Sequence, residues 1–219
     1  MRDPKIAVSG GLRTSAELEE ASLNKGWFDL NPGSWEEKMQ NFPKYVRRQN
    51  LTRFLVLYEI FKKVLNVKGS IIECGVNQGY GIMSWAKFSA IMEPVNLTRR
   101  IYGFDTFEGI PEDWHDEKAG TYSSDGNIPQ IEGGEFIVGK FEDTLPGFFS
   151  EPRPMASIIN FDADLYSSTI CALNFSKPVI DKRTILIFDE FIMNKNERSN
   201  DKRANQFLHN VSRAVNILI

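Results

Sequence analysis

The pattern of apolar and polar positions changes at about residue 70. Between residues 51 and 65, apolar side chains recur every three or four positions, which is the spacing of one face of an amphipathic helix. The preceding chain is less regular: residues 1–26 are mainly polar, and residues 26–45 mix aromatic side chains with proline and glycine. We therefore predict an N-terminal arm and irregular segment over residues 1–45, and a separate domain over residues 46–219.

From residue 70 onwards, short apolar runs alternate with segments of helical spacing. Apolar runs of about four to eight residues, bounded by turn residues, are typical of buried strands. Strands that alternate with helices favour an α/β fold with a doubly wound, mostly parallel sheet. The predicted strands cover residues 70–74, 99–105, 135–140, 155–162 and 183–189, and the predicted helices cover residues 80–91 and 167–178.

Four of the predicted strands end in an acidic residue: Glu73, Asp105, Asp162 and Asp189. In open α/β sheets, ligands bind outside the carboxyl ends of the strands. Acids gathered at that edge are poor core residues, and they indicate a binding site there.

The first of these acids opens a glycine-rich turn in the stretch IIECGVNQGYG. Its spacing is E-x-G-x-x-x-G from Glu73 through Gly75 to Gly79, which differs from the G-x-G-x-x-G dinucleotide fingerprint. The glycines let the backbone approach a ligand closely, and the next helix directs N–H groups toward it. A strand-to-helix turn without a ligand has the same pattern, so this stretch alone leaves both interpretations open.

An acid at the end of the second strand suits the two hydroxyls of a ribose. Asp105 lies 32 residues after Glu73 (105 − 73 = 32), which is about the length of one βαβ unit. The alternative interpretation is that Asp105 caps a following helix.

Two further acidic stretches, FDAD and FDEF, follow the fourth and fifth predicted strands. We expect Asp162 and Asp164 to share one face of an extended segment, since side chains two apart do so. If these strands are neighbours, Asp162, Asp189 and Glu190 converge, and a divalent cation removes their mutual repulsion. Oxygen ligands of this kind favour Mg²⁺ or Ca²⁺ over Zn²⁺. Helix capping by Asp162 or Asp189 is the alternative interpretation.

Residues 111–134, between the second and third strands, are rich in Gly, Pro, Asp and Ser and have no periodicity. A loop of this length is usually a lid, a binding loop or disordered. Because it leaves the ligand edge of the sheet, we predict a substrate lid. His115 lies within it and is a candidate substrate contact, whereas His209 is expected at the surface.

Composition limits the classes of partner. The 219 residues carry a formal net charge of −3, which gives no electrostatic signal for nucleic acid or an anionic membrane surface. We expect the basic pairs Arg47–Arg48 and Lys182–Arg183 to be solvated. Cys74 and Cys171 lie in apolar stretches, and their spacing suggests neither a disulfide framework nor a zinc site. No apolar run approaches the ~20 residues of a membrane span and no leader is recognisable at the N-terminus, so we expect a cytoplasmic protein.

Five motifs occur in the same order as in a known family. The stretches IIECGVNQGYG, YGFDTFEGIPE, KFEDTLP, FDADLYSST and ILIFDEF resemble those of the macrocin O-methyltransferase (TylF-like) family over roughly residues 45–195. The resemblance implies a class I methyltransferase with a Rossmann-like fold. It also implies S-adenosyl-L-methionine and Mg²⁺ as cofactors, and a small-molecule acceptor that is methylated on a hydroxyl of a sugar or glycoside.

The resemblance assigns roles residue by residue. It implies that Asp164 is the general base and that Asp162, Asp189 and Glu190 hold the metal. This family has Asp where the chain has Glu190, whose carboxylate is one methylene further from the backbone. The residues expected to contact the cofactor are Glu73, Gly75 and Gly79 at its methionine end, Asp105 at the ribose, Phe141 and Glu142 at the adenine, and also Thr106 and Asp162.

Two other functions stay open. The same chemistry would serve another small diol such as a catechol, and a methyltransferase-like domain can also act without catalysis, in assembly. Only 30 residues follow Asp189 (219 − 189 = 30), which is short for the helix and two strands that usually complete the fold. We therefore expect a shortened C-terminal sheet edge, and a homo-oligomer is a further expectation.

Overall fold

The computed structural model describes residues 15–189 except 97, 115 and 132. The chain passes from a first compact unit to a second between Val56 and Leu57. The first unit holds the helices α1 (Ser15–Leu30) and α2 (Trp35–Gln40), the short 3-10 helix η1 (Phe42–Lys44) and the beginning of α3 (Arg48–Lys63).

The segment expected to be irregular contains helix α2. Its start is fixed by a capping box, in which the Ser34 side chain accepts from Glu37 N and the Glu37 side chain accepts from Ser34 N. These reciprocal bonds satisfy N–H groups that the first turn of a helix leaves free. The S-x-x-E spacing that encodes them is therefore the signal for this helix.

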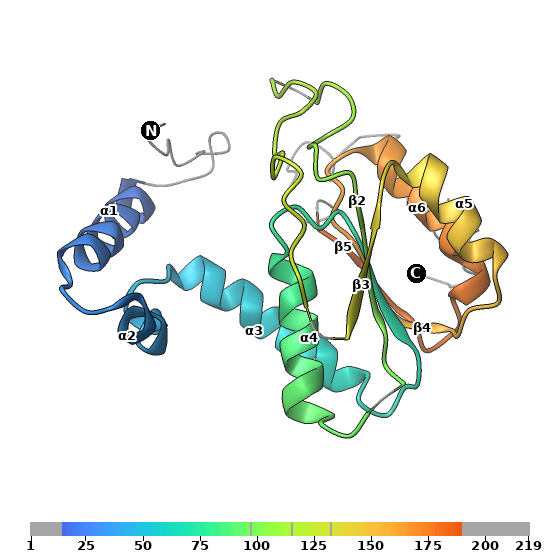
Figure 1. Ribbon diagram of the computed structural model, residues 1–219, viewed down its shortest axis with the longest axis horizontal. Helices are drawn as coiled ribbons and strands as arrows, with labels where there is room; N and C mark the ends of the chain where they lie inside the picture. Colours follow the sequence, from blue (N-terminus) through green and yellow to red (C-terminus); the bar gives the residue numbers. More distant parts are fainter. Residues whose placement is uncertain (1–14, 97, 115, 132, 190–219) are drawn as a thin grey trace. The chain divides into compact units, whose positions relative to one another are not determined.

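The second unit is built on a parallel sheet with strand order β3-β2-β1-β4-β5 (Figure 1). The predicted doubly wound, mostly parallel sheet is confirmed. The shortened C-terminal edge falls on residues outside the described part of the chain. The strands are β1 (Ser70–Cys74), β2 (Ile101–Asp105), β3 (Gly134–Val138), β4 (Ala156–Phe161) and β5 (Ile185–Phe188).

Helices cover both faces of this sheet (Figure 1). One face carries α4 (Tyr80–Met92) and the second half of α3, where the ring of Phe88 lies 5.8 Å from that of Phe61. The other face carries α5 (Phe141–Ser150), α6 (Tyr166–Ser176) and the short η2 (Lys177–Val179). All five residues of β1 are buried, as expected of a central parallel strand covered on both sides.

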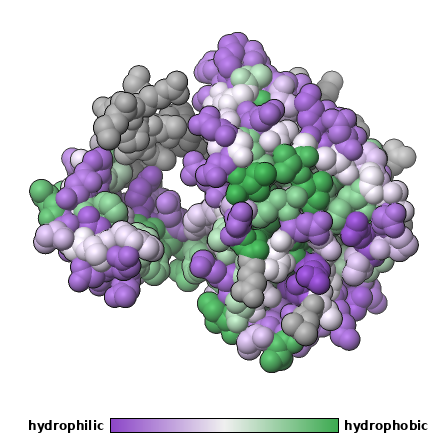
Figure 2. All heavy atoms as spheres, in the orientation of Figure 1, coloured by the Kyte–Doolittle hydropathy of each residue, from purple (hydrophilic) through white to green (hydrophobic). Residues whose placement is uncertain are grey.

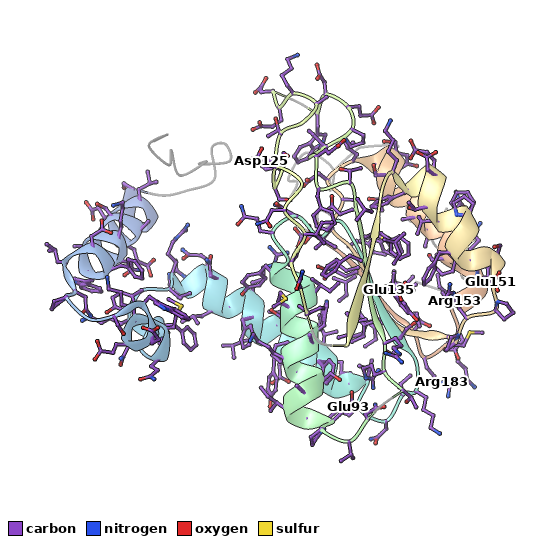
Figure 3. The ribbon with its side chains drawn as sticks, viewed as in Figure 1. Glu93, Asp125, Glu135, Glu151, Arg153 and Arg183 are labelled. Atoms are coloured by element: carbon purple, nitrogen blue, oxygen red, sulfur yellow. The ribbon has the colours of Figure 1, made fainter. Side chains whose placement is uncertain are left out.

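The amino end of the sheet is held by one buried arginine. The Arg99 side chain is 2% exposed and Nη2 donates to Glu93 Oε1 at 2.7 Å. Figure 3 shows Glu93 at the end of the unit opposite to Asp125, which lies in the predicted lid. Arg99 thereby connects the loops before β1 and β2 to the start of β4. The remaining acceptors of its guanidinium are the carbonyls of Val64, Val67 and Gly69 and the hydroxyl of Ser157.

Both cysteines are free: Cys74 is buried and Cys171 is half-buried on α6. Burial raises the pKa of both thiols. Among the described residues, no helix combines the length and apolar character needed to cross a bilayer.

Candidate active site

The carboxyl ends of β4 and β5 bring two predicted site residues together. Phe161 and Phe188 are partners in the parallel register, and Asp162 and Asp189 are the next residues on each strand. The Asp189 N–H donates to the Phe161 carbonyl at 3.2 Å. The condition set for the convergence of Asp162 and Asp189, that their strands are neighbours, is therefore met.

Gly75 directly follows β1 and lies against Asp162, which directly follows β4. Its φ is +94°, and a Cβ added there would lie 1.8 Å from the carbonyl oxygen of Asp162. Gly79 begins helix α4 as its N-cap residue, with φ +87°, and Pro129 of the predicted lid lies against it. Both glycines are thus needed for backbone geometry, and Gly75 sets the spacing between the glycine-rich turn and Asp162.

The substitution Gly75→Ala is expected to lower the free energy of unfolding by about 2 to 3 kcal/mol, because it combines left-handed backbone strain with overpacking. Urea denaturation measures this loss. Gly147→Ala is the matched control, since a Cβ at Gly147 meets nothing within 4 Å inside α5. Alanine there is expected to stabilise the protein by about 0.5 to 1 kcal/mol. Equal stability of the two variants would contradict the prediction.

Glu73 lies inside the protein, beneath the glycine-rich turn. It is 1% exposed, and its Oε1 accepts from Ile82 N at 2.8 Å while its Oε2 accepts from Trp85 Nε1 at 3.0 Å and Asn160 Nδ2 at 3.2 Å. Ile82 is in the first turn of α4, whose N-cap residue has no capping side chain. Glu73 therefore accepts a hydrogen bond from an N–H group that the start of α4 would otherwise leave without an acceptor. Contact between Glu73 and the cofactor stays a prediction.

The partners of Glu73 were not found by sequence reasoning. Gly81 is one of them, since a Cβ there would lie 2.3 Å from Glu73 Oε2. A glycine inside a helix is a weak signal of such close approach. Trp85 and Asn160 gave no signal, because their link to Glu73 arises only when α4 and β4 pack on β1.

Asp105 ties the end of β2 to the glycine-rich turn. Its Oδ2 accepts from Val76 N at 2.6 Å and from Asn77 N at 2.7 Å, and its Oδ1 accepts from Phe107 N at 2.7 Å. No helix follows Asp105 in the described chain before β3, so the capping interpretation does not hold. The predicted ribose contact stays a prediction.

Asp164 occupies a strained backbone position. Its φ is +57°, and Leu165 N donates to the Ala163 carbonyl at 2.5 Å, which closes a three-residue turn around it. The expectation of an extended segment from Asp162 to Asp164 is therefore wrong, because β4 ends at Phe161 and the chain turns before α6. Strain of this kind is concentrated at functional sites.

The Asp164 carboxyl lies within electrostatic range of two other acids. Burial raises the pKa of the Asp164 carboxyl, and the negative charges of Asp189 and Asp105 raise it further. Helix capping does not account for Asp164 or Asp162, since α6 has Leu165 as its N-cap residue and no side-chain cap. An acid with a raised pKa beside other acids is a candidate proton acceptor.

The donor set at this edge suits a hard cation. Asp162 and Asp189 follow paired residues of neighbouring strands and supply carboxylate oxygens, which Mg²⁺ prefers. Within residues 15–189, no three acidic, histidine or cysteine side chains form a group that could hold a metal. The third predicted ligand, Glu190, lies outside the described residues, as do His115 and His209.

The predicted lid is fastened at two points. The Phe107 carbonyl accepts from Gly126 N at 3.1 Å and from the hydroxyls of Ser123 and Ser124. On the other side, Ser167 Oγ donates to Glu112 Oε1 at 2.6 Å, which connects residues 111–134 to the first turn of α6. The loop is therefore held at the end of β2 and at the first turn of α6, and Pro129 adds its contact with Gly79 of the glycine-rich turn.

The last part of this loop borders the edge strand β3. Figure 2 shows apolar side chains gathered over this region, and Ile128 and Val138 are 40% and 50% exposed. A cavity of about 470 Å³ lies between residues 128–131 and β3.

The other predicted cofactor contacts lie around the same edge of the sheet. Thr106 Oγ1 donates to the Gly109 carbonyl and accepts from Glu108 N, so it shapes the start of the loop. Phe141 and Glu142 open α5; the Phe141 ring is half-buried against the core and Glu142 is exposed. Their contacts with a cofactor stay predictions.

Comparison with known proteins finds an O-methyltransferase as a relative. The chain is 28% identical over 145 residues to the 8-demethyl-8-(2,3-dimethoxy-alpha-L-rhamnosyl)-tetracenomycin-C 4'-O-methyltransferase of Streptomyces olivaceus. That match covers 57% of this chain and 54% of the relative, so the chain spans about half the length of the curated relative it matches.

Solved structures show the same fold. The calicheamicin methyltransferase CalS11 superposes with a TM-score of 0.74 at 28% identity, over 82% of this chain and 80% of that one. The O-methyltransferase NovP superposes with a TM-score of 0.50 at 24% identity, over 64% of this chain and 65% of that one. The predicted class I methyltransferase fold is confirmed.

A family model described as a methyltransferase domain matches residues 72–191. This range begins in β1, includes the glycine-rich turn, the lid and the acidic end of β4, and covers more than half of the chain. The chain therefore belongs to the methyltransferase domain family.

Proposed function

We propose that this protein is an S-adenosylmethionine-dependent O-methyltransferase that acts on a hydroxyl of a sugar or glycoside. The observation that carries the proposal is the meeting of the glycine-rich turn with the acidic ends of β4 and β5. Gly75 packs against the Asp162 carbonyl, and Asp162 and Asp189 follow paired residues of the two strands. The sugar acceptor is supported by the curated relative, whose name describes methylation of a rhamnosyl group.

S-adenosylmethionine supplies a methyl group activated by a positive sulfonium. The acceptor oxygen attacks the methyl carbon, a C–O bond forms, the C–S bond breaks, and the thioether leaves. In-line attack requires the two reactants to be held in register. Gly75 and Gly79 give the turn beside the donor its backbone shape, Asp105 accepts hydrogen bonds from the donor's ribose, and the predicted lid shields the site from water.

Asp164 takes the proton that the acceptor hydroxyl loses. A hydroxyl is a poor nucleophile while protonated, so a positioned base accelerates the transfer. Burial raises the pKa of the Asp164 carboxyl, so its affinity for the proton is higher than that of an ordinary aspartate. The turn around Asp164 fixes where this carboxyl lies after β4.

Asp162, Asp189 and Glu190 would hold Mg²⁺. When bound, the ion would stabilise negative charge on the acceptor oxygen. It would also offset the repulsion among the acids that follow β4 and β5.

An acceptor screen tests the reaction. The full chain is incubated with S-adenosylmethionine, Mg²⁺ and either a panel of glycosides and nucleotide-linked sugars or a panel of catechols, and mass spectrometry detects the gain of one methyl. Methylation of glycosides supports the proposal. Methylation of catechols alone would reassign the acceptor. Calorimetry that detects no binding of S-adenosylmethionine would favour a non-catalytic domain.

Chelation by EDTA is expected to lower turnover by at least about tenfold, and added Mg²⁺ is expected to restore it. In Asp162→Ala, turnover is expected to be lost together with its dependence on Mg²⁺, since a carboxylate of the proposed site is removed. Steady-state rates at graded Mg²⁺ concentrations measure both effects. Asp143→Asn, on the exposed side of α5, is the control. Mg²⁺-stimulated turnover in Asp162→Ala would contradict the proposed metal site.

A further inference from the structure

The buried carboxylate of Glu73 joins three elements of the second unit. Glu73 lies in β1, and its register partner in β4 is Asn160, which donates to it. Its other two donors, the Ile82 N–H and the Trp85 indole N–H, belong to α4. All four residues are 4% exposed or less. A side chain this deeply buried offers a ligand little surface, so Glu73 would act on a ligand through the residues that it holds.

The donors around Glu73 require a carboxylate. Oε1 accepts from the Ile82 backbone N–H at 2.8 Å, and Oε2 accepts from the Trp85 indole N–H at 3.0 Å. Both groups are donors only. A glutamine has one oxygen and one NH₂ group, so in either orientation its NH₂ would meet one of these two N–H groups. Space is limited as well, since a Cβ added at Gly81 would lie 2.3 Å from Oε2. The network therefore needs two acceptor oxygens at residue 73.

The glycine-rich turn lies between the two ends of this network. Glu73 and Ile82 are nine residues apart and flank residues 75–79, so their hydrogen bond joins the strand before the turn to the helix after it. The start of the turn is also tied to β4, because the Asp162 N–H donates to the Cys74 carbonyl at 2.9 Å. Both ends of the turn are therefore attached to the central strands of the sheet.

We propose that Glu73 is a positioning residue for donor binding. It fixes the start of α4 against β1 and β4, and it thereby keeps residues 75–79 in the shape that receives S-adenosylmethionine. A turn that is ordered in advance binds its ligand without the cost of ordering it on binding. The effect on the donor rests on the proposed function, whereas the effect on the turn does not.

Hydrogen exchange of the full chain, followed by mass spectrometry, tests the effect on the turn without any ligand. In Glu73→Gln, the amides of residues 76–83 are expected to exchange at least about tenfold faster than in wild type, because a buried N–H group is left facing another donor. Exchange in α5 and β5 is expected to stay within about twofold. Glu135→Gln is the control, since it removes the exposed carboxylate labelled on β3 in Figure 3, and its exchange is expected to match wild type.

Two results of this exchange experiment would overturn the proposal. The first is equal exchange over residues 76–83 in wild type and Glu73→Gln. The second is equal acceleration throughout the second unit, because it would show that Glu73 contributes to general stability and not to the turn in particular.

Calorimetry and steady-state rates test the effect on the donor. The Kd for S-adenosylmethionine is expected to rise at least about tenfold in Glu73→Gln. At saturating donor, kcat is expected to stay within about threefold, because the proposed base Asp164 is unchanged. An unchanged Kd together with faster exchange of the turn would overturn the positioning role. A wild-type protein that binds no S-adenosylmethionine would instead contradict the proposed function, and hydrogen exchange would still decide whether Glu73 holds the turn.

A double variant tests the hydrogen-bond argument itself. Trp85→Phe removes the indole N–H and keeps an aromatic ring in the core. In Glu73→Gln/Trp85→Phe, the glutamine oxygen can accept from the Ile82 N–H while its NH₂ no longer meets an indole donor, and Asn160 can turn its amide oxygen toward it. Exchange of the turn and the Kd for the donor are therefore expected to lie closer to wild type than in Glu73→Gln alone.

The double variant also decides the case in which Glu73→Gln does not fold. Recovery of a folded protein, measured by circular dichroism, supports the requirement for two acceptor oxygens beside Trp85. A double variant that behaves no better than Glu73→Gln would overturn the proposal.

Discussion

Asp164→Asn is expected to lower kcat for methyl transfer by about 10²- to 10⁴-fold, the usual contribution of a positioned general base. The amide keeps the size of the side chain but cannot accept the proton of the acceptor hydroxyl. Asparagine also tolerates the φ of +57° at this position, so the turn after β4 is expected to persist. Initial rates with a saturating glycoside acceptor measure the effect.

The affinity for S-adenosylmethionine separates a chemical role from a structural one. Calorimetry is expected to give the same dissociation constant for Asp164→Asn and wild type, within about twofold. Asp143→Asn, which removes an exposed carboxylate from α5, is expected to retain the wild-type rate. If Asp164→Asn kept more than about a tenth of the wild-type rate, Asp164 would not be the base and the proposed mechanism would need another proton acceptor.

Arg99→Met is expected to lower the free energy of unfolding by about 3 to 5 kcal/mol, the cost of breaking a buried ion pair. Methionine fills the volume of the arginine stem, so the loss comes from the charge and its hydrogen bonds rather than from a cavity. The Glu93 side chain, 7% exposed, is left as a buried charge without its guanidinium. Urea denaturation followed by circular dichroism measures the change.

Arg183→Met provides the exposed counterpart. Arg183 pairs with Asp181 at 2.8 Å, but its side chain is 56% exposed, and surface pairs contribute only about 0 to 1 kcal/mol. The double variant Arg99→Met/Glu93→Leu is expected to be more stable than Arg99→Met alone, because the isolated buried carboxylate is also removed. A loss in Arg99→Met no larger than in Arg183→Met would show that the network at the amino end of the sheet contributes little.

The sheet was predictable because its strands are short, apolar and separated by helical spacing. Helix α5 was not predicted, since Pro146 and Gly147 interrupt its sequence, FEDTLPGFFS. Pro146 has no N–H group, and a proline inside a longer helix would disrupt it. Here Pro146 is the sixth of the ten residues of α5, and the first half of the helix follows closely on the end of β3. Packing of Leu145 and Phe148 into the core overrides the weak local preference.

At the site, sequence reasoning found acids but not their surroundings. The strand ends placed Asp105, Asp162 and Asp189 at one edge because parallel strands share a direction. The burial of Glu73 was not predicted, because it depends on donors from α4 and β4 that are distant in sequence. The turn at Asp164 was also missed, since aspartate is compatible with both extended and left-handed backbone.

The hydrogen bonds that Asp105 accepts should make the amide signals of the glycine-rich turn sensitive to ligand binding. One oxygen, Oδ2, holds the N–H groups of both Val76 and Asn77 at 2.6 and 2.7 Å. A ribose hydroxyl that donates to this carboxylate draws electron density from both of its oxygens, so it weakens those two bonds. In a ¹⁵N-labelled protein, the two amide resonances would therefore shift as the nucleoside enters, and they would serve as built-in spectroscopic probes of occupancy that require no attached dye.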